Sequence, residues 1–249
     1  MIHPLHPAMA ALLPNVARPA TSVTEMRAQS AADKAPHNAR AAEGLSLTPS
    51  TVRAAESMRP MLLVGPRTAR APVVHIHGGG WSIGTPEGHL SLLAGLHKAT
   101  GRQVIAPHPR QAPEHPHPAP LDDSVAMLQE LCADAGPIHL SGDSAGAHLA
   151  LRAAGTTTGR GLPILSIALC YGCYRRRFDT ASHRSFGDGS FGLSTDRMRR
   201  FWDWYDPGGT ADLSGADVDG LPPLQLHAAA CDILRDDTLW LAARLDAVG

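Results

Sequence analysis

From Met61 onward, short apolar runs alternate with segments of helical periodicity. The apolar runs predict strands at 61–64, 73–76, 104–106, 138–140, 164–169 and 224–226. Between them, apolar residues recur at spacings of three and four, which predicts helices at 90–100, 121–133, 145–154 and 236–247. Because strands alternate with helices, we expect an α/β fold with a mostly parallel sheet covered by helices on both faces.

Two segments depart from this alternation. Residues 1–44 are rich in Ala, Pro and His, and the weak periodicity of 24–42 is compatible with one or two short helices or a partly ordered arm. An Arg-rich insertion between Tyr174 and Gly209 contains seven of the eleven aromatic residues. It could be a helix pair that packs on its own apolar face or a lid that walls an acyl pocket, and we expect it to do both.

These patterns predict an N-terminal arm over 1–60 that contributes to a cap and one main domain over 61–249, with the cap insertion at about 174–209. A chain of 249 residues is long enough to bury one sizeable core. With 43% hydrophobic and 18% charged residues, the composition is typical of a globular protein.

Charge and hydropathy narrow the classes of partner. The formal net charge is -1, so nothing favours nucleic acid or an acidic membrane surface. No apolar run approaches the roughly 18 residues of a membrane span, and no leader pattern opens the chain, so we expect a cytoplasmic protein. The C-x-x-C pair Cys170 and Cys173 has no second pair to complete a zinc site, so these cysteines are interpreted as packing residues and no metal is expected.

The sequence Gly142-Asp143-Ser144-Ala145-Gly146 lies between a predicted strand and a predicted helix, the context of a nucleophile elbow. The serine must occupy a strained turn to project above the sheet, and side chains at the flanking glycines would clash with neighbouring backbone. We therefore predict Ser144 as the nucleophile.

A glycine run, Gly78 to Gly80, lies at the end of the predicted strand 73–76, preceded by His77 and followed by Trp81. Glycines let backbone N–H groups approach an oxyanion closely, and the amide of Ala145, after the nucleophile, is a further donor. We predict an oxyanion hole here, with Trp81 as a substrate-binding residue. His77 is interpreted as a structural residue that hydrogen-bonds the loop.

In these motifs the chain resembles the hormone-sensitive-lipase-like esterases, the α/β-hydrolase fold-3 group. The resemblance runs from about Met61 to Gly249 and includes Arg110, the segments 112–116 and 121–123, the elbow, 221–223 and 232–237. It implies an α/β-hydrolase fold with a helical cap formed by the N-terminal arm and the insertion. It also implies hydrolysis of short- to medium-chain acyl esters, with no cofactor and a small-molecule ester as the partner.

Carried over by position, the resemblance makes Asp232 the acid of the triad and Gly79, Gly80 and Ala145 the oxyanion donors, with Gly78 shaping the turn. A carboxylate after the next strand is placed to orient an imidazole above Ser144. Asp236 and Asp237 are interpreted as first-turn residues of the closing helix, where negative charge is favourable.

The family's catalytic histidine lies roughly thirty residues after the acid, but no histidine follows His227. We therefore expect the last strand and helix of the fold to be missing and the open sheet edge to favour aggregation or a homodimer. His148 and His227 are poor candidates for the base. A second departure is Pro107-His108-Pro109, where relatives usually carry an Asp-Tyr pair.

Three functions remain open at this stage. The leading hypothesis is a serine carboxylesterase that forms an acyl-enzyme at Ser144. The alternatives are an arylformamidase-like amide hydrolase, suggested by the segment 146–149, and a catalytically inactive binding protein on the hydrolase scaffold, suggested by the absent histidine.

Overall fold

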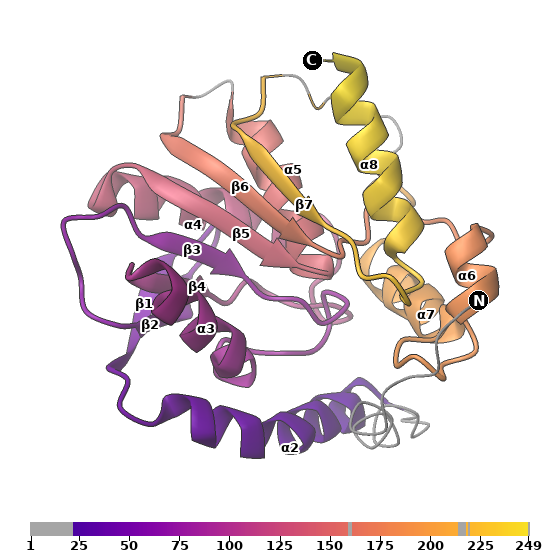
Figure 1. The fold of residues 1–249 in the computed structure, drawn as a ribbon, viewed down its shortest axis with the longest axis horizontal. Coiled ribbons are helices and arrows are strands. Elements are labelled where there is room, and N and C mark those ends of the chain that lie inside the picture. Colours follow the sequence, from indigo (N-terminus) through magenta and orange to yellow (C-terminus); the bar gives the residue numbers. More distant parts are fainter. Residues whose placement is uncertain (1–21, 159–160, 214–217, 219, 249) are drawn as a thin grey trace.

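A seven-stranded sheet in the order β1-β2-β4-β3-β5-β6-β7 forms the centre of the fold (Figure 1). The computed structural model describes residues 22–158, 161–213, 218 and 220–248. Within them the strands are β1 (Leu47–Arg53), β2 (Met58–Val64), β3 (Val73–Ile76), β4 (Val104–Pro107), β5 (Ile138–Asp143), β6 (Ile164–Cys170) and β7 (Leu224–His227). β1 pairs with β2 and β2 with β4 in antiparallel fashion, and the remaining pairs are parallel. The predicted α/β class is confirmed.

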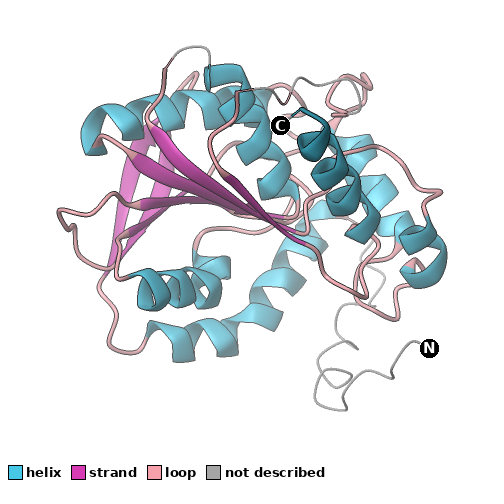
Figure 2. Cartoon of the chain, turned by 45° about the horizontal axis from the view of Figure 1, so that its top comes forward, coloured by secondary structure: helices cyan, strands magenta, loops and turns pink. Residues whose placement is uncertain are grey.

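Helices cover both faces of this sheet (Figure 2). They are α2 (Val23–Ala42), the 3₁₀ turn η1 (Glu87–His89), α3 (Leu90–Thr100), α4 (Ala119–Ala135), α5 (Ala145–Thr158), α6 (Ala181–Phe186), α7 (Thr195–Tyr205) and α8 (Arg235–Val248). α4 and α5 pack together on one face, whereas α3 covers the other face with α2 outside it. Among the described helices, none combines the length and the apolar character that a membrane crossing requires.

Burial explains why the sequence pattern predicted most strands. β3 and β4 are buried at every position, as central strands covered on both faces must be, and they appear as continuous apolar runs. β1 was missed because it is an edge strand of mixed polarity, in which only Val52 is buried. The sheet therefore begins at Leu47, not at Met61, and residues 47–60 belong to the sheet instead of the arm.

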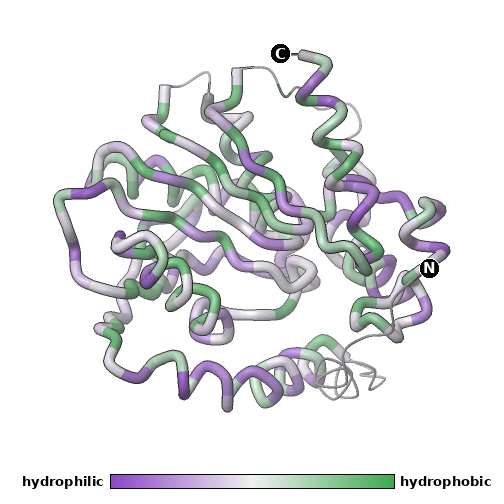
Figure 3. Tube along the Cα trace, in the orientation of Figure 1, coloured by the Kyte–Doolittle hydropathy of each residue, from purple (hydrophilic) through white to green (hydrophobic). Residues whose placement is uncertain are grey.

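The N-terminal arm forms a single long helix over Val23–Ala42, where the sequence left its structure open. Ser22 and Glu25 cap its first turn reciprocally, because each side chain accepts a hydrogen bond from the other residue's backbone N–H, both at 3.2 Å. Hydrophilic residues recur along α2, whereas the central strands are more hydrophobic (Figure 3). Residues 1–21 of the predicted arm lie outside the described part of the chain.

The aromatic insertion folds as α6 and α7 and packs against the glycine loop. Trp202 and Tyr205 are fully buried, and the Tyr205 ring stacks on Trp81 with ring centroids 4.2 Å apart. The buried carboxylate of Asp237, in the first turn of α8, accepts hydrogen bonds from the backbone N–H groups of Tyr174 and Arg175 at 2.9 and 3.0 Å. These contacts tie the insertion to both the sheet and α8.

Candidate active site

Ser144 occupies the turn between β5 and α5 with φ of 51°. A non-glycine residue with this φ is strained by roughly 1–3 kcal/mol and needs a surrounding structure that enforces it. The Ser144 N–H donates to the Cys170 carbonyl at the end of β6 at 2.9 Å. A Cβ at Gly142 would lie 2.6 Å from the Gly146 carbonyl oxygen, and one at Gly146 would collide with the Ile76 carbonyl. The local geometry is that of the predicted elbow.

The glycine loop stands next to this elbow with its three glycines in different environments. The Gly78 N–H donates to Asp143 Oδ1 at 2.8 Å, so it shapes the turn and is not available to a ligand. Gly79 and Gly80 have φ of 117° and 57°, and both line the same cavity as Ser144. Ala145 is buried at the first position of α5, where helix N–H groups have no partner within the helix.

The cavity above Ser144 has a volume of about 350 Å³, and besides the elbow three parts of the chain form its wall. These are α2, the loop after β3, and the cap insertion. Its lining residues are Gln29, Ser30, Asp33, Lys34, Gly79, Gly80, Ile83, Ser144, Gly192, Leu193, Arg197, Met198 and Phe201. The arm and the insertion therefore wall the cavity together, and the apolar side chains on the insertion side form its hydrophobic part.

Trp81, predicted to bind substrate, is not among these lining residues. Only 4% of its surface is exposed, and its ring packs against Tyr205, Trp202 and His148. The structure places Trp81 in the core behind the glycine loop, where it supports the loop from beneath.

No described histidine lines the cavity. His148 lies on α5 with its ring fully buried, and its Nε2 donates to the Ala211 carbonyl at 2.9 Å. Burial lowers the pKa of His148 to about 3. His227 ends β7, with its carbonyl accepting from the Tyr171 N–H at 2.7 Å. The His148 ring is therefore engaged away from the Ser144 hydroxyl, and neither His148 nor His227 lines the cavity.

Asp232 follows β7, which is parallel to β6. The carboxyl ends of β5, β6 and β7 therefore lie at the same edge of the sheet, with Ser144 after β5 and Asp232 after β7. Asp232 Oδ1 accepts a hydrogen bond from the Leu234 N–H at 2.9 Å, and burial raises the pKa of this carboxyl group. A half-buried carboxylate gains from a cationic partner, which an imidazolium would supply.

Sequence reasoning missed a stack of histidines that supports the glycine loop. The His77 ring stacks on those of His89 and His108, with centroids 5.2 and 5.1 Å apart. His77 Nδ1 donates to the Gly78 carbonyl at 2.8 Å, so its Nε2 is free to accept a hydrogen bond from His108 Nδ1, also at 2.8 Å. The interpretation of His77 as a loop-holding residue agrees with these contacts.

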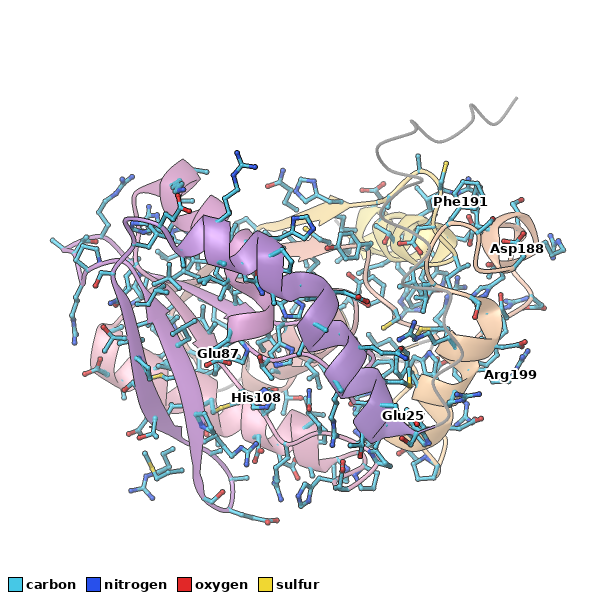
Figure 4. The ribbon with its side chains drawn as sticks, turned by 90° about the horizontal axis from the view of Figure 1, so that it is seen from below. Glu25, Glu87, His108, Asp188, Phe191 and Arg199 are labelled. Atoms are coloured by element: carbon cyan, nitrogen blue, oxygen red, sulfur yellow. The ribbon has the colours of Figure 1, made fainter. Side chains whose placement is uncertain are left out.

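The only signal for this stack in the sequence was the departure at His108 from the family pattern. Figure 4 shows His108 and Glu87 on the side of the molecule that α2 crosses. Burial lowers the pKa of His108 to about 4 and holds that of His77 well below its usual range. The rings are therefore neutral at pH 7, and one neutral imidazole donates to the other.

Asp143 anchors the same region from the elbow. Its Oδ1 accepts from Gly78 N at 2.8 Å and from His75 Nε2 at 3.2 Å, while His75 Nδ1 contacts Ser141 Oγ at 2.7 Å. Burial opposes ionisation of Asp143, but the hydrogen bond from His75, the nearby His89 and the Gly78 N–H outweigh it and hold its pKa well below the usual range. Asp143 is an anion that fixes the elbow to the glycine loop.

The free energy of unfolding should fall as the pH drops from about 6.5 to 4. His108 and His148 have folded pKa values of about 4 and 3, below the unfolded value of about 6.5. In this pH window the two side chains are protonated in the unfolded chain but neutral in the folded chain, so protonation stabilises the unfolded state. Each histidine contributes a slope of about 1.4 kcal/mol per pH unit, and His108 alone on the order of 3 kcal/mol. Urea titrations at several pH values measure this slope. His108→Gln should reduce the slope by about 1.4 kcal/mol per pH unit, the contribution of one histidine. An unchanged slope would contradict the lowered pKa of His108.

The comparisons with known proteins agree with this geometry. The family model described as alpha/beta hydrolase fold matches residues 73–249. The chain is 34% identical to an acetyl-hydrolase of Streptomyces hygroscopicus, over 66% of this chain and 58% of the relative. It is 36% identical to carboxylesterase NlhH of Mycobacterium tuberculosis, over 71% of this chain and 61% of the relative. The chain thus spans about three fifths of the length of these curated relatives.

Among solved structures, a hyperthermophilic esterase from Pyrobaculum calidifontis superposes with a TM-score of 0.91 at 27% identity, covering 99% of this chain and 87% of that one. The family match covers most of the chain, and the strand order, the elbow and the glycine loop follow the predicted pattern. The chain therefore belongs to the hormone-sensitive-lipase-like group of the α/β-hydrolase fold family.

Proposed function

We propose that this protein acts as a serine carboxylesterase that hydrolyses short- to medium-chain acyl esters. One observation carries the proposal: Ser144, in its strained turn, faces the same cavity as Gly79 and Gly80. A nucleophile and backbone donors around one cavity are the two parts that acyl transfer needs. The names of the relatives, which include acetyl-hydrolase and carboxylesterase, support the same reaction class.

In the proposed reaction, Ser144 Oγ attacks the ester carbonyl carbon and its proton passes to a histidine oriented by Asp232. The N–H groups of Gly79, Gly80 and Ala145 stabilise the negative oxygen of the tetrahedral intermediate. The intermediate then expels the alcohol, which takes the proton from the imidazolium, and leaves an acyl-enzyme. Water hydrolyses the acyl-enzyme by the same steps in the second half. None of these steps requires a metal ion or an organic cofactor.

The cavity supports acyl groups of limited length. Ile83, Leu193, Met198 and Phe201 supply its apolar surface, so a short alkyl chain gains roughly 0.8 kcal/mol for each buried CH₂. A volume of about 350 Å³ has no room for a long fatty chain beside the alcohol portion. Butyrate should therefore be preferred to acetate, and palmitate should be rejected.

The test is an extended version of the chain, in which residues 1–249 are joined to the segment that follows the matched region in a relative and that carries the family histidine. We expect it to hydrolyse p-nitrophenyl acetate and butyrate faster than N-formyl aryl amides. Faster turnover of the formamides would support the arylformamidase alternative instead. A lack of turnover on either class would favour a binding protein on this scaffold.

Replacing Gly79 by Val in this extended version should reduce kcat by about 100-fold or more, the usual scale for loss of an oxyanion donor. A Cβ at Gly79 would collide with the Ile83 carbonyl, and its φ of 117° disfavours any side chain, so the loop must move away from Ser144. Steady-state kinetics with p-nitrophenyl butyrate measure the loss, and a thermal melt checks that the variant folds. Gly95→Ala, at a glycine of α3 where a Cβ meets nothing within 4 Å, is the control. A loss under threefold would show that the loop is only a turn.

A further inference from the structure

Lys34 lies on α2, the helix that packs outside α3, and its side chain lines the cavity of Ser144. The helix is held in place by Arg27, which lies about two turns before Lys34 in α2. The Arg27 guanidinium makes a bidentate ion pair with Glu114 at 2.7 and 2.8 Å and also donates to the Ser82 carbonyl at 2.8 Å. Because Ser82 follows the glycine loop, these contacts fix α2, and with it Lys34, relative to the proposed oxyanion donors.

The ammonium group of Lys34 has one polar contact among the described residues, with His89 Nε2 at 3.4 Å. His89 Nδ1 donates to the Thr85 carbonyl at 3.0 Å, so Nε2 of this neutral ring is an acceptor. It accepts a hydrogen bond from one of the three N–H groups of the Lys34 ammonium. Burial lowers the pKa of both Lys34 and His89. Two N–H donors of Lys34 are therefore left without an acceptor in the described part of the chain.

No carboxylate of the described residues forms an ion pair with Lys34. The nearest buried acid, Asp143, already has its Oδ1 engaged by Gly78 and His75, and its Oδ2 lies 3.9 Å from His89 Nε2. His89 thus stands between Lys34 and Asp143. A partly buried ammonium without a paired carboxylate is costly, and an anion that enters the cavity would relieve this cost.

Two other charged side chains line the cavity, Asp33 and Arg197. Burial lowers the pKa of Arg197, Arg200 lowers it further, and Asp33 acts in the opposite direction. The negative charge of Asp33 raises the pKa of Arg197, and that of Asp143 raises the pKa of Lys34, in both cases against the effect of burial. The cavity thus has Lys34 beside Asp33 on the α2 side, and apolar side chains beside Arg197 on the insertion side.

We propose that Lys34 makes this site selective for esters that carry a carboxylate group. The proposal rests on the proposed function in one respect, since it takes the ester carbonyl to lie at Ser144 while the carboxylate lies at Lys34. The cavity of about 350 Å³ holds roughly a dozen water volumes, which is room for a small dicarboxylate monoester. A neutral short-chain ester would contact the apolar side chains of the cavity and leave the Lys34 ammonium unpaired.

Binding to residues 1–249 tests this proposal without any need for turnover. Monomethyl glutarate and dimethyl glutarate differ by one charge on the acyl portion, and acetoxyacetate and its methyl ester differ by one charge on the alcohol portion. In at least one of the two pairs, we expect the anion to bind about tenfold more tightly than its neutral partner, as one charge-assisted hydrogen bond would give. High salt should remove this difference in Kd. Titration by ligand-observed NMR measures each Kd.

Lys34→Met should abolish the preference because it keeps most of the side-chain bulk but removes the charge, and Lys34→Arg should retain part of it. Lys98→Met, which removes the same charge from an exposed position on α3, should leave the preference intact. Melting temperatures check that all variants fold. Equal binding of anion and neutral ester in both pairs, or a preference that survives in Lys34→Met, would overturn the proposal. A Lys34-dependent preference in a protein whose extended version hydrolyses nothing would refute the proposed function alone.

Discussion

Extending residues 1–249 with a histidine-bearing segment should raise turnover of p-nitrophenyl acetate by about a million-fold. Loss of the histidine from a serine triad costs about that factor in a well-studied hydrolase, which corresponds to roughly 8 kcal/mol of barrier. We expect the unextended chain to show at most traces of activity. Purified samples of the two versions, assayed side by side on acetate and butyrate esters, give the ratio directly.

The structural reason is that the described histidines near the elbow are held in other roles. His148 is buried and bonded to the Ala211 carbonyl. His77, His89 and His108 form a stack behind the glycine loop. Each ring uses a nitrogen on a backbone carbonyl or on another ring, so none is placed to take the proton of Ser144.

The control for this experiment is the same extension with its histidine replaced by Ala, which should return turnover to that of residues 1–249. Comparable high turnover in the unextended chain would contradict the argument. It would turn attention to His148 and His227, and His148→Ala and His227→Ala would then identify the base.

Replacing Ser144 by Ala should abolish covalent labelling by serine-directed phosphonates. The change deletes only the hydroxyl group, and Ala145 and Gly146 still support the turn, so the fold should be kept. Intact-mass spectrometry of the extended version after incubation with a phosphonate measures the labelled fraction. Turnover of p-nitrophenyl butyrate should fall in parallel by about a million-fold, the scale for loss of a serine nucleophile.

Ser57→Ala is the matched control, because Ser57 is exposed in the turn between β1 and β2, far along the chain from the elbow. It should be labelled as fast as the unchanged protein. Peptide mapping of the labelled protein should place the phosphonate on Ser144. Labelling of Ser144→Ala at the parent rate would show that another residue is the nucleophile and that the elbow has only a structural role.

Much of the fold follows from short-range pattern. β3 and β4 are buried at every position, so they had to be continuous apolar runs, and α3 was predicted with the bounds that it has. The elbow was also predictable, because the strained turn and its close backbone contacts depend on residues within a few positions of Ser144. Periodicity and turn chemistry depend on residues that lie close together along the chain, so they can be recognised in a single sequence.

β1, the cavity wall and the histidine stack were beyond the reach of such patterns. An edge strand of mixed polarity lacks the alternation that marks a half-buried strand, so β1 was assigned to the arm. Trp81 follows the glycines and was expected to meet substrate, but contacts with Trp202 and Tyr205, more than one hundred positions later, turn its ring into the core. Packing between distant segments decided its role.

The chain's own pattern is thus enough to specify its class, its order of strands and helices, and the position of Ser144, because these depend on burial periodicity and on backbone sterics between neighbours. The contents of the cavity depend on which distant segments meet there. Lys34 from α2 and Phe201 from α7 share the cavity of Ser144, and Asp237 from α8 accepts from the backbone of Tyr174 and Arg175. No periodicity links these residues, since their proximity is a product of the whole packed fold.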